Sequence, residues 1–365
     1  MASQWDLIIV GGGLAGSALA FWCSKLPLKI LLLEATAPGA GGATVHSRGI
    51  VRVYDPLYAL MTKSIQGIQV WNEIAATHPD IFTRCGLVYL LNAEHQALAR
   101  QRIAEFSSDE YPIHMLSEVE SIHCFPTLQR HCFSDKRIAL WEPLGGYVNP
   151  RQAARIFIDE ARFHGVEILE GSPVKAVREV SGGVEVITGI DTRLPTKLAV
   201  IATGAHTPQL YPGSQIFSRT IPLSCLQSMK SDAPEQCIID ECSGGYLRPE
   251  SSSFFFVGGA TQYNASNPDQ LHWQPEQANA HHHQVANQLL TCQSIVVDGR
   301  NGYDGYTANY LPEIQCPQDR SIAIFSGFSG RGAKYIPWAA REFSQQLAKR
   351  LSVQPLCIKN NSDQL

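Results

Sequence analysis

The sequence predicts an α/β fold with two lobes, and three observations lead to this prediction. An apolar run at residues 6–10 is followed by a glycine turn and then by helix-forming residues. Buried-strand patterns followed by small residues or glycines recur at residues 197–205 and 322–334. The chain has 365 residues, whereas a single core stops growing at roughly 250–300 residues. We therefore expect two packed lobes that are interleaved in sequence.

Composition narrows the class of protein. With 44% hydrophobic and 17% charged residues, the chain is globular rather than disordered. A net charge of −4 and the lack of a basic stripe exclude a nucleic-acid platform. The longest apolar stretches fall far short of the roughly 18 residues of a membrane span. No signal-peptide pattern opens the sequence, which predicts a cytoplasmic protein, and in that compartment its ten cysteines are expected to be free.

The first motif is the sequence GGGLAG at residues 11–16, between the strand at 6–10 and a helix. Gly11 permits the tight turn and Gly13 lets the backbone approach a pyrophosphate. Gly16 lets the helix pack closely on the sheet, so that helix N–H groups point at the anion. This order predicts a Rossmann-like dinucleotide site.

The second strand, at residues 29–33, ends at Glu34, which lies 18 positions after Gly16. A carboxylate at this place accepts hydrogen bonds from the ribose hydroxyls of the dinucleotide. A phosphate on the 2′ oxygen would be repelled there, which disfavours NADP.

The next segments favour FAD over NAD. Residues 39–52 form a long glycine-rich segment that a minimal NAD domain does not need, and that can cover the second half of a longer cofactor. The strand at 197–201 is closed by small residues that let a backbone pass close to a ligand, among them Ala202 and Gly204.

The segments between these motifs contain no further glycine fingerprint. The expected helices lie at residues 57–78, 94–106, 150–165 and 275–290. The expected strands lie at residues 86–91, 166–169, 174–180 and 184–187.

The last strand, at 322–325, leads into a glycine loop at 326–334 and a helix through about residue 349. A helix N-terminus at this place favours the negative charge of a reduced flavin. The glycines of this loop are Gly327, Gly330 and Gly332.

Taken together, these motifs resemble the D-amino-acid oxidase superfamily of FAD enzymes, which includes glycine oxidase and monomeric sarcosine oxidase. The resemblance covers nearly the whole chain. It rests on GGGLAG with Glu34, GGYVNP at 145–150, VIATGA at 200–205, GGYLRP at 244–249 and GFSGRGAKYIPW at 327–338. It implies a Rossmann-like FAD-binding lobe with an interleaved α+β substrate lobe built on an antiparallel sheet.

The resemblance also assigns segments to the lobes. The FAD-binding lobe is expected in 1–54, 146–215 and 298–365, and the substrate lobe in 55–145 and 216–297. By motif match, the residues that bind the cofactor are Gly11, Gly13, Gly16, Glu34, Val174 at the adenine, Ala202, Gly204, Gly327, Gly330 and Gly332. No cysteine precedes Tyr306 and Thr307, where sarcosine oxidase attaches its flavin, so noncovalent FAD is expected.

The activity that the resemblance implies is oxidation of a C–N bond in a small amine or amino acid, with hydride transfer to the flavin. Arginine is the usual anchor for a substrate carboxylate because it pairs in bidentate fashion. The candidate anchors are Arg52, Arg48 and Arg248. The other catalytic candidates are His46, Tyr246 and Lys334, with Tyr306 as a candidate for the pocket wall. Without the resemblance, each of these would be interpreted as an ordinary structural or surface residue.

Two alternatives stay open. Residues 254–264 contain no lysine, although sarcosine oxidase uses a lysine over the flavin to activate oxygen, so fast oxidase chemistry is in doubt. This favours, as an alternative, a flavoprotein that modifies a protein substrate, such as one that matures a quinone cofactor in an amine oxidase. A third hypothesis is a scaffold protein that binds FAD without redox activity.

The run of histidines at residues 281–283 does not predict a metal site. Consecutive side chains on a helix point in different directions and cannot converge on one ion. We expect a solvated helix face and no metal.

Overall fold

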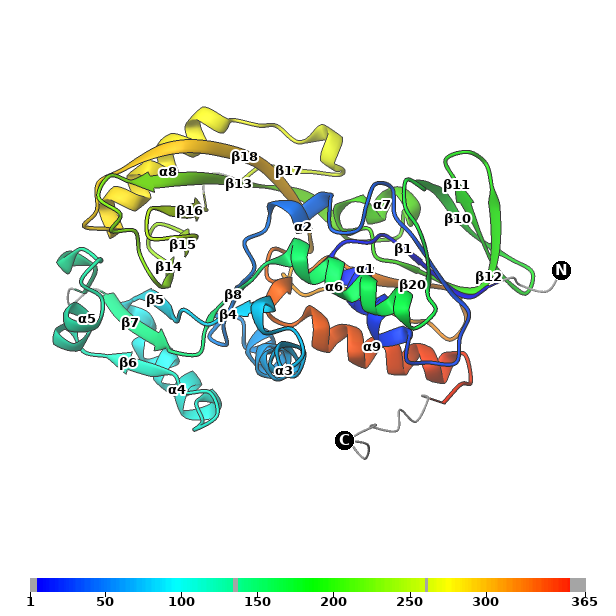
Figure 1. The fold of residues 1–365 in the computed structure, drawn as a ribbon, viewed down its shortest axis with the longest axis horizontal. Helices are drawn as coiled ribbons and strands as arrows, with labels where there is room; N and C mark the ends of the chain where they lie inside the picture. The colour runs from blue at the N-terminus through cyan, green and yellow to red at the C-terminus, as the bar shows by residue number, and fades with distance from the viewer. Residues whose placement is uncertain (1–4, 134–136, 260–261, 355–365) are drawn as a thin grey trace.

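The computed structural model describes residues 5–133, 137–259 and 262–354, which form two lobes side by side (Figure 1). Within these residues the first lobe is built on an eight-stranded sheet in the order β10-β11-β12-β1-β2-β9, with β20 beside β12 and β19 beside β20. Its parallel strands are β1 (Trp5–Val10), β2 (Ile30–Leu33), β9 (Glu167–Leu169), β12 (Arg193–Ile201) and β20 (Ile322–Ser326). Antiparallel strands extend it, namely β10 (Val174–Val180), β11 (Gly183–Thr188) and β19 (Glu313–Gln315).

Helices cover this sheet on the face that carries the larger core (Figure 1). They are α1 (Leu14–Cys23), α3 (Tyr58–Ala75), α6 (Pro150–Phe163) and α9 (Ile336–Arg350). In α6, Asn149 caps the N-terminus by accepting hydrogen bonds from the N–H groups of Arg151 and Gln152 at 3.2 Å. The apolar stripe of α6 buries Phe157, whose ring stacks on Phe21 of α1 and on Trp71 of α3. This packing holds the first glycine turn at the carboxyl end of β1.

The second lobe is built on a nine-stranded sheet, as far as the described residues go, in the order β17-β13-β16-β15-β14-β5-β7-β6, with β18 on β13. All neighbours are antiparallel except β14 and β5. Its strands are β5 (Leu87–Asn92), β6 (His114–Leu116), β7 (Arg137–Glu142), β13 (Phe217–Ser228), β14 (Cys237–Asp240), β15 (Gly245–Pro249), β16 (Phe254–Gly258), β17 (Asn264–Ala265) and β18 (Ser294–Tyr306). The predicted fold class is therefore confirmed, with one parallel pair inside the second sheet.

Shorter elements connect the two sheets. A three-stranded sheet, β3-β8-β4, contains β3 (Ile50–Val51), β4 (Phe82–Thr83) and β8 (Gly146–Val148). The remaining α-helices of the described residues are α2 (Gly42–His46), α4 (Gln96–Phe106), α5 (Glu118–Cys124), α7 (Thr207–Leu210) and α8 (Pro275–Leu289). The sequence pattern missed α2 and α5 because five and seven residues are too few for a helical period to stand out.

Three details differ from the sequence-based expectations. The helix α3, which was expected in the substrate lobe, packs on α9 in the first lobe. β18 continues in the second sheet to Tyr306, so the chain returns to the first lobe later than residue 298. The expectation of a solvated histidine run is wrong for His282, which is fully buried under the sheet and bonds Ser224 Oγ through Nδ1 at 2.6 Å. Burial lowers the pKa of His282 to about 4. None of the helices in the described ranges is long and apolar enough to cross a bilayer.

Candidate active site

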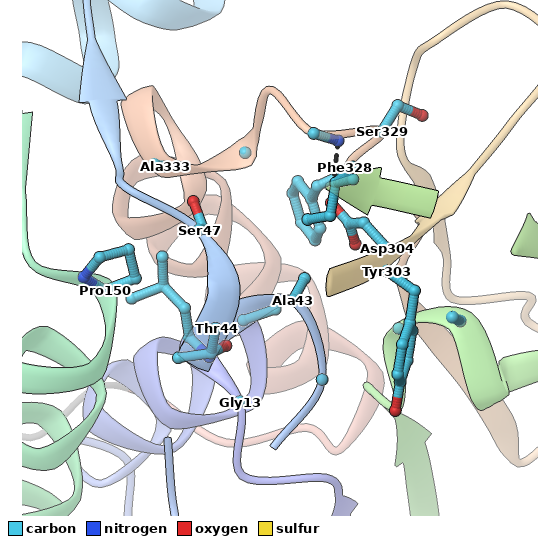
Figure 2. Close-up of a pocket in the computed structure, with 18 of the residues that line it drawn as sticks. Gly13, Ala43, Thr44, Ser47, Pro150, Tyr303, Asp304, Phe328, Ser329 and Ala333 are labelled. Atoms are coloured by element: carbon cyan, nitrogen blue, oxygen red, sulfur yellow. Dashed lines mark hydrogen bonds between the residues drawn. The ribbon is translucent and has the colours of Figure 1, made fainter. Parts of the chain in front are cut away.

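A cavity of about 910 Å3 is lined by residues from both lobes. Figure 2 shows Gly13 and Thr44 on one side of this space and Asp304 and Phe328 on another. The cavity brings together most of the predicted site residues, namely Gly11, Gly13, Glu34, Arg52, Val174, Ala202, Gly204, Tyr246, Gly327, Gly330, Gly332 and Lys334. Gly16, His46 and Arg248 are not part of its lining.

The first glycine turn is shaped by close backbone approach. Gly11 has a φ of +104°, and a Cβ atom there would lie 2.7 Å from the carbonyl oxygen of Ala202. A Cβ atom on Gly16 would lie 1.8 Å from the carbonyl oxygen of Gly11. Gly16 therefore acts as predicted without touching the cavity, because it lets α1 pack against the turn. The first turn of α1 leaves its N–H groups without helical acceptors, and Leu14 donates its own to Thr44 Oγ1 at 2.9 Å.

Glu34 is held at the end of β2 by backbone N–H groups. Its Oε2 accepts a hydrogen bond from Gly12 at 2.6 Å, and its Oε1 accepts one from Thr36 at 2.9 Å. Oε1 also accepts a hydrogen bond from Thr36 Oγ1 at 3.1 Å, whereas Oε2 keeps a further lone pair, and the residue lines the cavity. The carboxylate is thus placed to accept hydrogen bonds from a diol.

The second glycine loop follows β20 and is fixed against β18. Gly327 and Gly330 have φ values of +72° and +69°. Asp304 Oδ2 accepts a hydrogen bond from the Gly330 N–H at 2.9 Å, and Oδ1 accepts one from the Gly305 N–H at 2.7 Å. Burial raises the pKa of Asp304 to about 6. A side chain on Gly330 would collide with the Tyr306 hydroxyl, because a Cβ atom there would lie 2.4 Å away.

A buried cluster of charges lies where the second glycine loop meets the segment after β3. Asp55 is fully buried and accepts hydrogen bonds from Arg331 through Oδ1 and from Lys334 through Oδ2, each at 2.7 Å. Arg52 lies 3.2 Å from the same Oδ2 atom. We call Asp55, Arg52, Arg331 and Lys334 the Asp55 cluster.

The Asp55 cluster shifts the pKa values of its members. Burial opposes ionisation of Asp55, but Lys334, Arg52 and Arg331 hold its pKa below the ordinary range. Burial lowers the pKa of Lys334 to about 7, with Arg52 acting in the same direction and Asp55 opposing it. The cluster therefore contains three cationic side chains that share one carboxylate, and all three line the cavity.

Tyr246, on β15, belongs to the side of the cavity that the second sheet forms, and Arg48 packs against this sheet. Burial raises the pKa of Tyr246 to about 12, so its hydroxyl stays protonated and can donate a hydrogen bond. The Arg48 guanidinium lies 4.0 Å from the centroid of the Phe256 ring. Burial, together with Arg300, lowers the pKa of Arg48 to about 10.

The side chains of His46 and Arg248 lie outside the cavity. The Arg248 guanidinium lies 3.6 Å from the centroid of the Tyr147 ring and pairs with Glu250. A Cβ atom on Gly302 would lie 2.6 Å from His46 Cβ, so this histidine packs directly on β18. Neither side chain lines the cavity, and we propose no direct substrate contact for them.

The sequence did not predict four of the residues that line the cavity, namely Arg219, Asp304, Tyr310 and Arg331, nor the buried Asp55 behind them. For Asp55 the spacing from Arg52 was a usable signal, because the two form an i,i+3 pair. Arg331 lies inside the predicted glycine loop. Nothing local in the sequence marks Arg219 or Tyr310, which come together only through the pairing of β13 with β18.

Known proteins resemble this chain along its length. A model of the DAO family, described as FAD dependent oxidoreductase, matches residues 6–346. N-methyl-L-tryptophan oxidase from Yersinia pestis is 26% identical over 214 residues, which are 57% of this chain and 56% of the relative. The chain thus spans just over half the length of the curated relatives that it matches.

Solved structures share the fold at low identity. The crystal structure of L-proline dehydrogenase from P. horikoshii superposes with a TM-score of 0.81 at 19% identity, and covers 98% of this chain and 96% of that one. Glycine oxidase from Geobacillus kaustophilus gives a TM-score of 0.80 at 19% identity and covers 95% of each chain.

Proposed function

Because the chain belongs to the DAO family of FAD-dependent oxidoreductases, we propose that it oxidises a C–N bond of a small amine or amino acid by hydride transfer to noncovalently bound FAD. One observation carries the substrate part of this proposal. The Asp55 cluster gathers three cations around one carboxylate in the same cavity as both glycine turns. The surplus positive charge suits the carboxylate of an amino acid.

The residues of the cavity fit FAD. The turn at Gly11 and Gly13 leaves backbone space and helix N–H groups for a pyrophosphate, and Glu34 offers a carboxylate to the ribose. The second loop, at Gly327 and Gly330, offers backbone N–H groups at the other end. Bound FAD supplies a two-electron acceptor for the hydride. Among the described residues that line the cavity there is no cysteine, which supports noncovalent binding.

The chain itself orients the substrate. Arg52, Arg331 and Lys334 anchor its carboxylate, with the arginines able to pair in bidentate fashion. Asp55 is a positioning residue, because it holds the three cationic side chains in place and is itself fully buried. Tyr246 donates a hydrogen bond from the sheet side of the cavity. Such orientation lowers the barrier by removing the entropy of the encounter.

The names of relatives support an amine substrate. N-methyl-L-tryptophan oxidase is named for an N-methylated amino acid. The structural neighbours are named for glycine, L-proline and iminodiacetate. The cytoplasmic location and the lack of a nucleic-acid partner stay predictions from the sequence.

The test is an anaerobic titration of the FAD-loaded protein with glycine, N-methylglycine, proline and D-amino acids, followed by loss of oxidised-flavin absorbance. The proposal expects complete bleaching by at least one of them. If none bleaches the flavin while dithionite does, the proposal fails and the protein-substrate alternative gains support. If dithionite also fails, the chain is a redox-silent scaffold.

A further inference from the structure

The cavity contains a cation that the Asp55 cluster does not explain. Arg219 lies on β13 and lines the cavity. Its Nε donates a hydrogen bond to Asn264 Oδ1 at 2.8 Å, and one terminal nitrogen donates to the Tyr310 hydroxyl at 3.2 Å. Across residues 5–133, 137–259 and 262–354, it has no carboxylate oxygen within 4.0 Å, whereas Arg52, Arg331 and Lys334 all reach Asp55.

Two tyrosines place Arg219 beside the Asp55 cluster. The ζ carbon of Arg219 lies 4.5 Å from the centroid of the Tyr306 ring and 5.6 Å from that of Tyr310. The ζ carbon of Arg331 lies 5.0 Å from the same Tyr310 centroid, so the two ζ carbons are at most about 11 Å apart. Both guanidinium groups therefore lie close to the Tyr310 ring, and both arginines line the same cavity.

Tyr310 is held in this place by an unusual backbone conformation. Its φ is +60°, in the left-handed region that a bulky residue seldom adopts. The hydrogen bond from Arg219 lowers the pKa of Tyr310, because the cation stabilises the phenolate form. Tyr310 in this conformation contacts both arginines and accepts a hydrogen bond from Arg219.

The acidic residues of the cavity are engaged elsewhere. Asp304 is the cross-strand neighbour of Arg219, but its two oxygens accept hydrogen bonds from backbone N–H groups of the glycine loop and of β18. Glu241 bonds His95, and Asp240 lies 3.4 Å from Arg137. Glu34 is held at the nucleotide end. The charge of Arg219 is therefore unmatched by a direct partner.

We propose that the substrate carries two carboxylates, one bound by the Asp55 cluster and the second bound by Arg219 beside Tyr310. The substrate class is then an acidic amino acid or an N-substituted amino dicarboxylate. This inference rests on the proposed function for the first carboxylate. Arg219 acts as a specificity residue, since it selects the substrate and has no part in the hydride step.

Two four-carbon acids that cannot be oxidised provide the test, because succinate and butyrate differ by one carboxylate. Each is titrated into the oxidised holoenzyme and followed by calorimetry and by the flavin spectrum. A charge-assisted hydrogen bond is worth ~1.5–3 kcal/mol, so the inference expects succinate to bind about 10- to 150-fold more tightly than butyrate. R219M is expected to reduce this ratio to below about 3, and R219K to keep most of it.

A matched control variant separates direct binding of the second carboxylate by Arg219 from a general effect of positive charge near the cavity. Arg300 lies on β18, pairs with Asp298 at 3.4 Å and does not line the cavity. R300M is therefore expected to keep the succinate preference. The inference is overturned if wild type binds both acids equally, or if R300M lowers the ratio as much as R219M does. If R219M does not fold, the Tyr310→Phe variant, which removes one partner of Arg219, is expected to lower the ratio about threefold, and an unchanged ratio in it contradicts the inference.

The test also keeps the two proposals apart. Because neither acid is a substrate, the affinity ratio judges the second carboxylate site even if no amine reduces the flavin. Conversely, reduction of the flavin by an amino acid together with equal binding of the two acids would retain the proposed function and remove the inference.

Discussion

The two ends of the cavity are built in opposite ways. At the end that we propose binds the nucleotide, the surface is backbone, and the glycines matter because they lack side chains. A Cβ atom on Gly16, for example, would lie 1.8 Å from the carbonyl oxygen of Gly11. At the substrate end the surface is charged side chains, and Asp55 balances cations that lie 276 and 279 residues away in the chain. Added side-chain volume should therefore disturb the first end most, whereas loss of a charged group should disturb the second end most.

The largest effect is expected from adding volume at the nucleotide end. Gly16→Val forces α1 away from the turn, because its Cβ would overlap the Gly11 carbonyl oxygen. The purified variant should retain no FAD, measured as the ratio of absorbance at 450 nm to that at 280 nm. Gly213→Ala is the control, because a Cβ there meets only the edge of the Tyr211 ring, at 3.1 Å. Full flavin content in Gly16→Val would contradict the account of this turn.

Removing charge at the substrate end should cost stability. Asp55→Asn keeps the shape but leaves three cations without their anion, so the free energy of unfolding should fall by about 3–5 kcal/mol in urea titrations. Asp298→Asn breaks an exposed pair with Arg300, and should cost less than about 1 kcal/mol.

The effect of Asp55→Asn also has a definite pH dependence. Because the folded pKa of Asp55 lies below its unfolded value, its contribution is present at neutral pH and is lost as the pH falls through the folded pKa. The difference from wild type should therefore shrink in acid. If Asp55→Asn and Asp298→Asn lowered the free energy of unfolding by the same amount at pH 7, the expected difference between the buried and the exposed carboxylate would be contradicted.

The charge of Lys334 should make substrate affinity depend on pH. Its folded pKa of about 7 means that the ammonium group is present below pH 7 and is lost above it. The apparent Kd of a carboxylate ligand should rise by up to about tenfold per pH unit above 7. The free energy of unfolding should rise over the same range, because the unfolded lysine still binds a proton that the folded one has released. An apparent Kd that is constant from pH 6 to 9 would contradict this.

The smallest effect is expected from Glu34→Gln. The amide keeps one acceptor for the N–H groups of Gly12 and Thr36 but loses the charge. FAD affinity should fall by about 1–2 kcal/mol, or roughly tenfold, as measured by equilibrium dialysis. A loss as complete as that of Gly16→Val would mean that charge also dominates the nucleotide end.

The same contrast explains how far the sequence predicted the molecule. The strand, glycine turn and helix around Gly11 are contiguous, so spacing alone predicted the first lobe and its dinucleotide site, whereas the antiparallel sheet of the second lobe came from the resemblance. The resemblance added Arg52, Tyr246 and Lys334, which do line the cavity.

The remaining site residues depend on tertiary contacts. Asp55 and Arg331 meet only because the segment after β3 packs on the loop after β20. Arg219 and Tyr310 meet because β13 pairs with β18, a register that periodicity does not reveal. Arg248 lies on the predicted hairpin and on the same face of β15 as Tyr246, yet its guanidinium stacks on the ring of Tyr147 and does not line the cavity.

We propose that the Asp55 cluster anchors the carboxylate of an amine substrate in the cavity that binds the flavin. The most direct measurement compares anaerobic flavin reduction by the best amino acid substrate and by the same compound with its α-carboxylate converted to a methyl amide. The account predicts that the free acid reduces the flavin at least about 100-fold more efficiently in wild type, and that this preference falls below about fivefold in K334M at unchanged FAD content. Equal reduction by the acid and its amide in wild type would contradict it.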